Sequence, residues 1–192
     1  DITTDSEIRD LVGDVWYERT MIIPVTWINK RIVLRFGSVT HYGKVWVNGK
    51  FLMEHKGGYL PFEGELSDMV APGETARITV KVNNILDYQT LPPGEIEILD
   101  DPYRYKEPIK VQRYFHDFYN YAGIHRPVKL YMTPKNYISD IKVDTQICGK
   151  DGLVYFEIEH CKEGSIKVEI KDKEGKIVGN TCKSKGCITI EN

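Results

Sequence analysis

The segment 114–127 holds the residue types best suited to bind a sugar. It combines five aromatic side chains with His116, Asp117, Asn120, His125 and Arg126. Flat aromatic faces pack against the C–H faces of a pyranose, while carboxylate and amide groups hydrogen-bond its hydroxyls. Asp117 is the hardest of these residues to explain structurally, because an unpaired buried carboxylate is costly. An equally good interpretation is that these aromatic side chains only close the end of a sandwich core.

The sequence predicts no complete active site. A glycosidase needs two carboxyl groups about 5–9.5 Å apart across a cleft, and the paired acids are Glu95 with Glu97 and Asp100 with Asp101. These acids fall in a polar, Pro-flanked stretch, 94–108, that we interpret as a solvated loop. A G-x-S-x-G nucleophile motif and H-x-x-x-H metal spacing are both absent from the sequence. We therefore expect no catalytic residue, no metal and no cofactor.

Four cysteines occur, and none of them forms a C-x-x-C pair: Cys148, Cys161, Cys182 and Cys187. A structural zinc site needs tightly spaced ligands, so ordinary buried, reduced thiols are the expectation. Reduced thiols and the absence of a signal sequence favour a cytoplasmic location. The chain begins at Asp1 without an initiator Met, so we expect a processed or excised piece.

The elements that must position the segment 114–127 are strands. Apolar residues alternate with polar ones in 76–82 and 128–132, and 32–36 is a short apolar run. Asn48-Gly49 lies between the apolar runs 45–47 and 51–53, which is the strongest short-range hairpin signal a sequence can carry. The pattern predicts an all-β chain.

Two domains are expected, with a boundary near Pro134, which lacks a donor for a β-ladder. Residues 1–134 have many short strands and long loops, which favours a jelly-roll (galactose-binding-like) β-sandwich with ligand loops at one end. Residues 135–192 have long Lys- and Glu-rich strands separated by Gly turns. This second pattern predicts a partial or small immunoglobulin-like β-sandwich, because a full one has about 100 residues.

Bulk properties exclude several classes of function. The 192 residues carry a formal net charge of −2, with 41% hydrophobic and 28% charged residues. This charge creates no field that would favour nucleic acid or an anionic membrane surface. The sequence also has no run of about 18 apolar residues, as a transmembrane helix needs. We expect a soluble globular protein without nucleic-acid or membrane partners.

Several motifs together resemble the N-terminal region of glycoside hydrolase family 2, and within that family the bacterial β-glucuronidases look most similar. The resemblance covers most of 11–134 in near-collinear order, and 135–192 match more loosely where the family has an immunoglobulin-like sandwich. The motifs that carry it are 11–19, 32–36, 39–49, 54–59, 82–84, 115–118 and 124–126.

The resemblance implies a jelly-roll domain, an immunoglobulin-like domain and then a (β/α)8 barrel, expected after Asn192, that carries two catalytic Glu residues. In similar enzymes the Asp of the Phe-His-Asp-Phe loop contacts the sugar in the barrel pocket. Asp117 is thereby implied to bind substrate, and the loop is implied to be shaped by Phe115, His116, Phe118 and Asn120. Gly123, His125 and Arg126 match the rest of the motif and are expected to be structural.

The expected function is that of the non-catalytic front portion of a retaining bacterial β-glucuronidase. Its implied partners are a glucuronide or related carbohydrate, the barrel, and further copies in a homotetramer of the full enzyme. One alternative is the same role in a β-galactosidase or β-mannosidase of the family. The barrel residues that face the C6 carboxylate of the sugar distinguish these enzymes from a β-glucuronidase, and they are not in this sequence. The other alternative is a free-standing carbohydrate-binding module.

Overall fold

The computed structural model describes residues 11–116, 121–160 and 164–191. Its secondary structure is β throughout, apart from one 3-10 turn, η1 (Val25–Trp27). The all-β prediction is confirmed. The chain divides into two compact units, residues 1–133 and 134–192, and each is described by itself.

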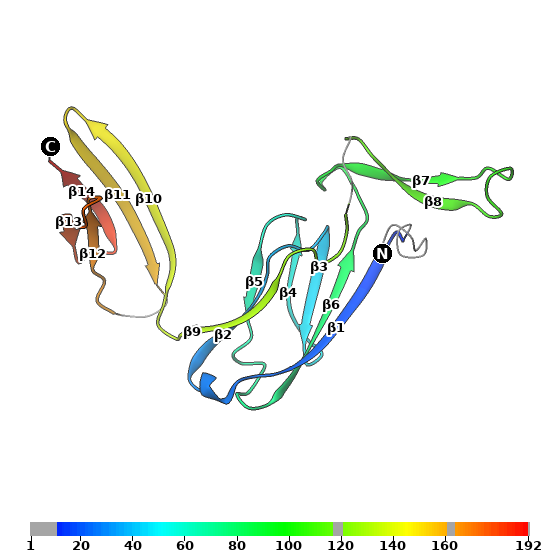
Figure 1. The fold of residues 1–192 in the computed structure, drawn as a ribbon, viewed down its shortest axis with the longest axis horizontal. Helices are drawn as coiled ribbons and strands as arrows, with labels where there is room; N and C mark the ends of the chain where they lie inside the picture. The colour runs from blue at the N-terminus through cyan, green and yellow to red at the C-terminus, as the bar shows by residue number, and fades with distance from the viewer. Residues whose placement is uncertain (1–10, 117–120, 161–163, 192) are drawn as a thin grey trace. The chain divides into compact units, whose positions relative to one another are not determined.

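One sheet of the first unit contains the predicted hairpin. The four strands β1 (Asp14–Ile22), β6 (Thr75–Asn83), β3 (Tyr42–Val47) and β4 (Lys50–Lys56) pair antiparallel in that order (Figure 1). Asn48 and Gly49 connect β3 to β4 with φ of +50° and +80°. Both values lie in the left-handed region that Gly adopts freely and Asn tolerates, so the hairpin prediction is confirmed.

The second sheet of this unit orders its strands β5 (Phe62–Glu65), β2 (Lys30–Phe36) and β9 (Val128–Pro134). Buried side chains of β2, β3 and β6 form one core cluster, so the two sheets pack face to face. Burial alternates along β6, as a half-buried strand requires. Full burial of each Val or Ile side chain on the buried face stabilises the fold by about 1.5–3 kcal/mol. The inward residues of β6 are Ala76, Ile78, Val80 and Val82.

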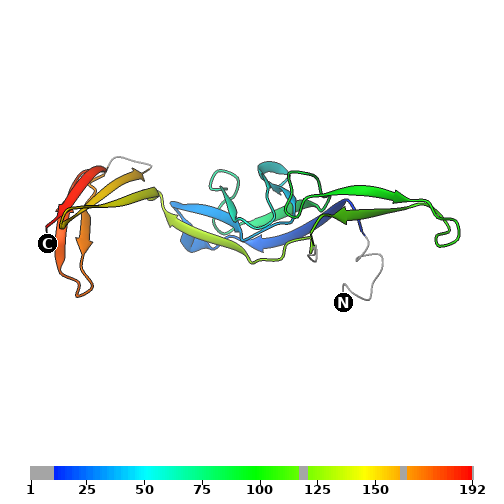
Figure 2. The ribbon, with the colours of Figure 1, turned by 90° about the horizontal axis from the view of Figure 1, so that it is seen from above.

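A separate two-stranded ribbon corrects the loop prediction for 94–99, while 100–108 form a connection without strand structure. Strands β7 (Gly94–Leu99) and β8 (Ile109–Tyr114) pair antiparallel and run side by side in both views (Figure 1, Figure 2). Glu95 and Glu97 therefore lie in a strand, although both carboxylates face solvent as expected. The local sequence does not indicate this ribbon, because pairing between the two strands holds it in place. One cross-strand contact is an ion pair of 3.6 Å between Glu97 and Arg113.

The second unit has a three-stranded sheet, β10 (Ile138–Cys148), β11 (Asp151–His160) and β14 (Lys185–Ile190), and a hairpin of β12 (Val168–Lys171) and β13 (Ile177–Thr181). A Cβ on Gly179 of β13 would stand 2.5 Å from Ile188, so the hairpin packs closely on β14. Phe156 and Ile188 are buried there. The same face of β10 is uncovered, and its Ile147 is 88% exposed.

The prediction of buried thiols is wrong for the cysteines in the described ranges, because Cys148, Cys182 and Cys187 are free and exposed. Strand alternation places Cys187 on the face opposite buried Ile188. Cys161 lies outside the described residues. Within those residues no three His, Cys, Asp or Glu side chains gather as metal ligands, and no helix has the length and apolar character needed to cross a membrane.

Candidate functional site

The predicted sugar-binding loop is held at its C-terminal flank by a backbone bridge. Gly123 N–H donates to the Thr40 carbonyl at 3.2 Å, and Thr40 N–H donates to the Gly123 carbonyl at 3.0 Å. Gly123 has a φ of +108°, and a Cβ there would stand 2.9 Å from the Tyr17 hydroxyl. Backbone conformation and space both require glycine at this position.

His125 strengthens this flank through two buried hydroxyls. Its Nε2 lies 2.7 Å from Ser38 Oγ and its Nδ1 lies 2.8 Å from Thr40 Oγ1. Ser38 Oγ donates to the Gly58 carbonyl at 2.6 Å. Thr40 Oγ1 also lies 3.3 Å from the Gly58 carbonyl, so both hydroxyls connect the imidazole to that carbonyl. We call His125, Ser38, Thr40 and the Gly58 carbonyl the histidine clamp.

Two further hydrogen bonds attach the residues that follow His125 to Tyr59 and Gly37. Arg126 Nη1 donates to the Tyr59 carbonyl at 2.9 Å, and Gly37 N–H donates to the Pro127 carbonyl at 3.0 Å. A Cβ on Gly37 would stand 2.8 Å from Arg126 Cβ. Residues 123–127 are thus fixed against the segments 37–41 and 57–59, which agrees with the structural role expected for Gly123, His125 and Arg126.

The N-terminal flank of the loop is held at Phe115. Its N–H donates to the Pro93 carbonyl at 3.1 Å. Its ring stacks on Tyr88, with centroids 5.8 Å apart and planes inclined by 28°. Tyr88 is 76% exposed and Phe115 is 46% exposed, so the pair presents aromatic surface to solvent. We call Tyr88 and Phe115 the aromatic ledge.

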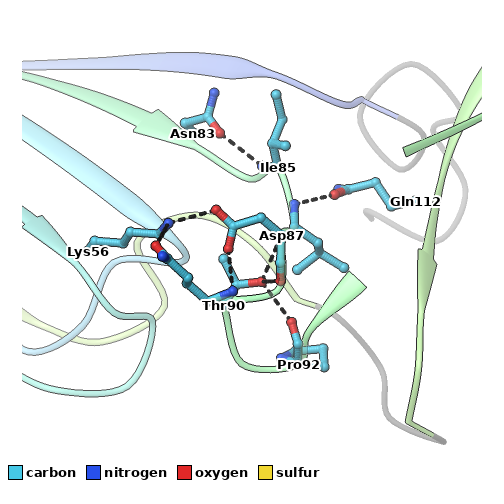
Figure 3. Close-up of polar contacts among 9 residues, drawn as sticks. Lys56, Asn83, Ile85, Asp87, Thr90, Pro92 and Gln112 are labelled. Atoms are coloured by element: carbon cyan, nitrogen blue, oxygen red, sulfur yellow. Dashed lines mark hydrogen bonds and ion pairs between the residues drawn. The ribbon is translucent and has the colours of Figure 1, made fainter. Parts of the chain in front are cut away.

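A polar network around Asp87 joins Lys56 and Thr90 (Figure 3), and it fixes the backbone on both sides of Tyr88. Lys56 Nζ donates to Asp87 Oδ2 at 2.6 Å and to Gln89 Oε1 at 3.1 Å. The other Asp87 oxygen accepts Gln89 N–H at 2.7 Å, which forms an Asx turn. Thr90 Oγ1 lies 2.8 Å from the carbonyls of both Asp87 and Pro92. The residues on either side of Tyr88 are therefore both anchored.

Gln112 of β8 joins this network to the ribbon (Figure 3). Its Oε1 accepts Leu86 N–H at 2.7 Å, and its Nε2 donates to the Asn84 carbonyl at 3.0 Å. One amide side chain thus satisfies two backbone groups of the segment that leads to Tyr88. The strand β8, which leads to Phe115, and the turn that carries Tyr88 are thereby held together.

The Lys56–Asp87 pair leads to a pH prediction. The hydrogen bond from Lys56 holds the pKa of Asp87 below its ordinary value of 3.8. A lowered folded-state pKa gives stability that is present above the unfolded-state value and lost as pH falls through the folded-state value. We expect wild type to exceed Asp87→Asn in stability by up to about 1 kcal/mol at neutral pH, because the pair is exposed. Thermal unfolding should show this gap closing between about pH 5 and pH 2, and a constant gap would contradict the pairing.

The predicted site residues fall partly within the described ranges. Phe115 belongs to the ledge, and His116 follows it with an exposed side chain. Asp117, Phe118 and Asn120 lie outside the described residues. Sequence reasoning missed Tyr88 and the network around Asp87. The available signal was an aromatic residue between a strand end and the turn Pro92-Pro93.

Comparison with known proteins identifies the family. The sequence model described as "Glycosyl hydrolases family 2, sugar binding domain" matches residues 2–134. A protein from Paenibacillus borealis named "Beta-glucuronidase" is 47% identical over all of this chain and is covered over 32% of its own length. A protein of the same name from Homo sapiens is 43% identical over 99% of this chain, with 30% of its length covered.

Solved structures of similar proteins agree. A β-glucuronidase structure from an uncultured Clostridium sp. matches with a TM-score of 0.83 at 47% identity, covering 100% of this chain and 32% of that protein. A β-D-glucuronidase from Dictyoglomus thermophilum matches with a TM-score of 0.87 at 41% identity, covering 100% of this chain and 33% of that protein. The chain spans about a third of the length of the relatives that it matches. On this evidence the chain belongs to glycoside hydrolase family 2, and residues 2–134 correspond to the sugar-binding domain of that family.

Proposed function

We propose that this chain is the non-catalytic portion of a retaining β-glucuronidase. It contributes scaffold and the Asp117 carboxylate to a sugar pocket that a (β/α)8 barrel completes. The similarity to proteins named β-glucuronidase over the whole chain supports the substrate class. The observation that carries the proposal is the fixation of both flanks of the loop, by the histidine clamp at one end and the aromatic ledge at the other.

The carboxyl groups with a resolved pKa shift are not suited to act as the general acid of a glycosidase. A general acid for glycoside hydrolysis needs a raised pKa. Among the described carboxyl groups with a resolved shift, every pKa is lowered: Asp14, Glu54, Glu63, Asp87 and Glu169. At Glu63 burial opposes this direction, but Arg35 and Tyr131 outweigh it. These groups stay ionised at neutral pH and suit ion pairs better than proton transfer.

The purified 192-residue chain should show no turnover of 4-nitrophenyl β-D-glucuronide above the buffer rate, because both catalytic carboxyl groups belong to the barrel. The complete polypeptide that includes this chain should hydrolyse the compound and prefer it to the matching β-galactoside and β-mannoside. Release of 4-nitrophenol from each substrate provides the measurement. Turnover by the chain alone would refute the non-catalytic role, and a reversed preference would assign the role to another activity of the family.

Titration of D-glucuronic acid into the chain separates this proposal from a free-standing carbohydrate-binding module. A half-site that needs the barrel should give weak or no heat of binding in calorimetry. Tight binding by the chain alone would favour the module.

We further propose that residues 1–134 form a jelly-roll domain and residues 135–192 part of an immunoglobulin-like sandwich. The uncovered apolar face of β10 supports the second assignment, because a sandwich needs a facing layer there. For the complete enzyme we propose a homotetramer in a bacterial cytoplasm. Light scattering on the complete enzyme should give four times the mass of one chain, and a monomer would contradict the tetramer.

A further inference from the structure

The aromatic ledge has no role yet in the proposed function. Both rings are exposed, and they stack on each other instead of turning into the core. Two adjacent exposed aromatic faces are the kind of surface that flat apolar groups bind, through offset stacking. The ledge is therefore a candidate contact for a part of the substrate other than the sugar hydroxyls.

The ledge is prepared for binding before a ligand arrives. Asp87 and Gln89 flank Tyr88, and Lys56 bonds to both of their side chains (Figure 3). Phe115 is fixed through its N–H to Pro93. Because the backbone under both rings is already ordered, stacking on them requires little further ordering.

The ledge also lies close along the chain to the proposed sugar contact. Phe115 precedes Asp117 by two residues, and two residues span at most about 7 Å. A group attached to the sugar that Asp117 contacts is therefore within reach of the ledge.

The chemistry of the ledge selects an uncharged, flat partner. Asp87, the charged neighbour of Tyr88 in sequence, is paired with Lys56 at 2.6 Å, while the two rings present exposed apolar surface. We propose that Tyr88 and Phe115 form the subsite for the aglycone of the glucuronide and favour planar aromatic aglycones. This inference rests on the proposed function, which supplies the sugar and its leaving group.

The test compares two substrates in the complete enzyme, phenyl β-D-glucuronide and methyl β-D-glucuronide. For each substrate, kcat/KM of the variant is divided by kcat/KM of wild type. The difference in leaving-group chemistry between the two substrates cancels in this ratio. Tyr88→Ala should lower kcat/KM for the phenyl substrate about 3- to 10-fold and leave the methyl substrate within about 2-fold of wild type. Tyr88→Phe keeps the ring and should retain both activities.

Tyr103→Ala is the matched control, because Tyr103 is 99% exposed in the turn between β7 and β8. It should leave both substrates unchanged. Equal losses on the two substrates with Tyr88→Ala, or no loss on either, would overturn the aglycone subsite. Failure of wild type to hydrolyse either glucuronide would instead refute the proposed function, so the two failures are distinguishable.

Discussion

Asp117→Asn in the complete enzyme should lower kcat/KM for a β-D-glucuronide by about 10- to 100-fold. A hydrogen bond to a charged group contributes about 1.5–3 kcal/mol, and the amide keeps the size of the side chain while removing its charge. Steady-state kinetics with phenyl and methyl β-D-glucuronide provide the measurement. The value of kcat/KM should fall by the same factor for both substrates, because Asp117 is proposed to contact the sugar that they share.

Asp68→Asn is the matched control for this substitution. Asp68 is an exposed carboxylate in the turn between β5 and β6 of the same unit, and its loss should change neither kinetics nor thermal unfolding. If Asp117→Asn unfolds at the wild-type temperature and keeps wild-type kinetics, Asp117 does not contact the substrate.

His125→Ala should destabilise the chain by about 2 kcal/mol and also lower kcat/KM of the complete enzyme. The substitution removes the imidazole between Ser38 and Thr40, which are both 0% exposed. Leaving a buried polar group unsatisfied costs about 1–3 kcal/mol. The same change releases one flank of the loop that carries Asp117. Urea unfolding of the chain measures the first effect, and kinetics of the complete enzyme measure the second.

His125→Gln distinguishes the hydrogen bonds of the clamp from the volume of the ring. The amide of Gln carries both a donor and an acceptor, which can replace the hydrogen bonds of the imidazole to Ser38 and Thr40. We expect it to recover much of the stability and kcat/KM that His125→Ala loses. Equal defects in the two variants would show that the hydrogen bonds of the clamp do not position the loop.

Features that depend on neighbouring residues could be predicted from the sequence. Asn48-Gly49 specifies its own turn, because the backbone angles it needs suit these two residue types. The alternation in 76–82 likewise indicates which side of β6 is buried. The ribbon of β7 and β8 was missed, since its order comes from pairing across a connection of nine residues, 100–108.

The geometry of the site depends on contacts between distant positions, which periodicity does not reveal. Ser38 and His125 are 87 residues apart in sequence, and nothing near either residue indicates that they meet. Tyr88 lies in a turn where an aromatic residue has no strand period to follow, so its exposure and stacking emerge only with the fold. The motif around Asp117 was recognisable through family resemblance, which also implied structural roles for His125 and Arg126. The distant partners of these two residues could not be predicted from the sequence.

The most direct test of the account is a crystal structure of the complete enzyme with D-glucuronic acid bound. We predict an Asp117 carboxylate oxygen within about 2.5–3.2 Å of a sugar hydroxyl. An Asp117 side chain that points into the interior of its own sandwich, paired with an Arg or Lys and out of hydrogen-bonding reach of the sugar, would contradict the account.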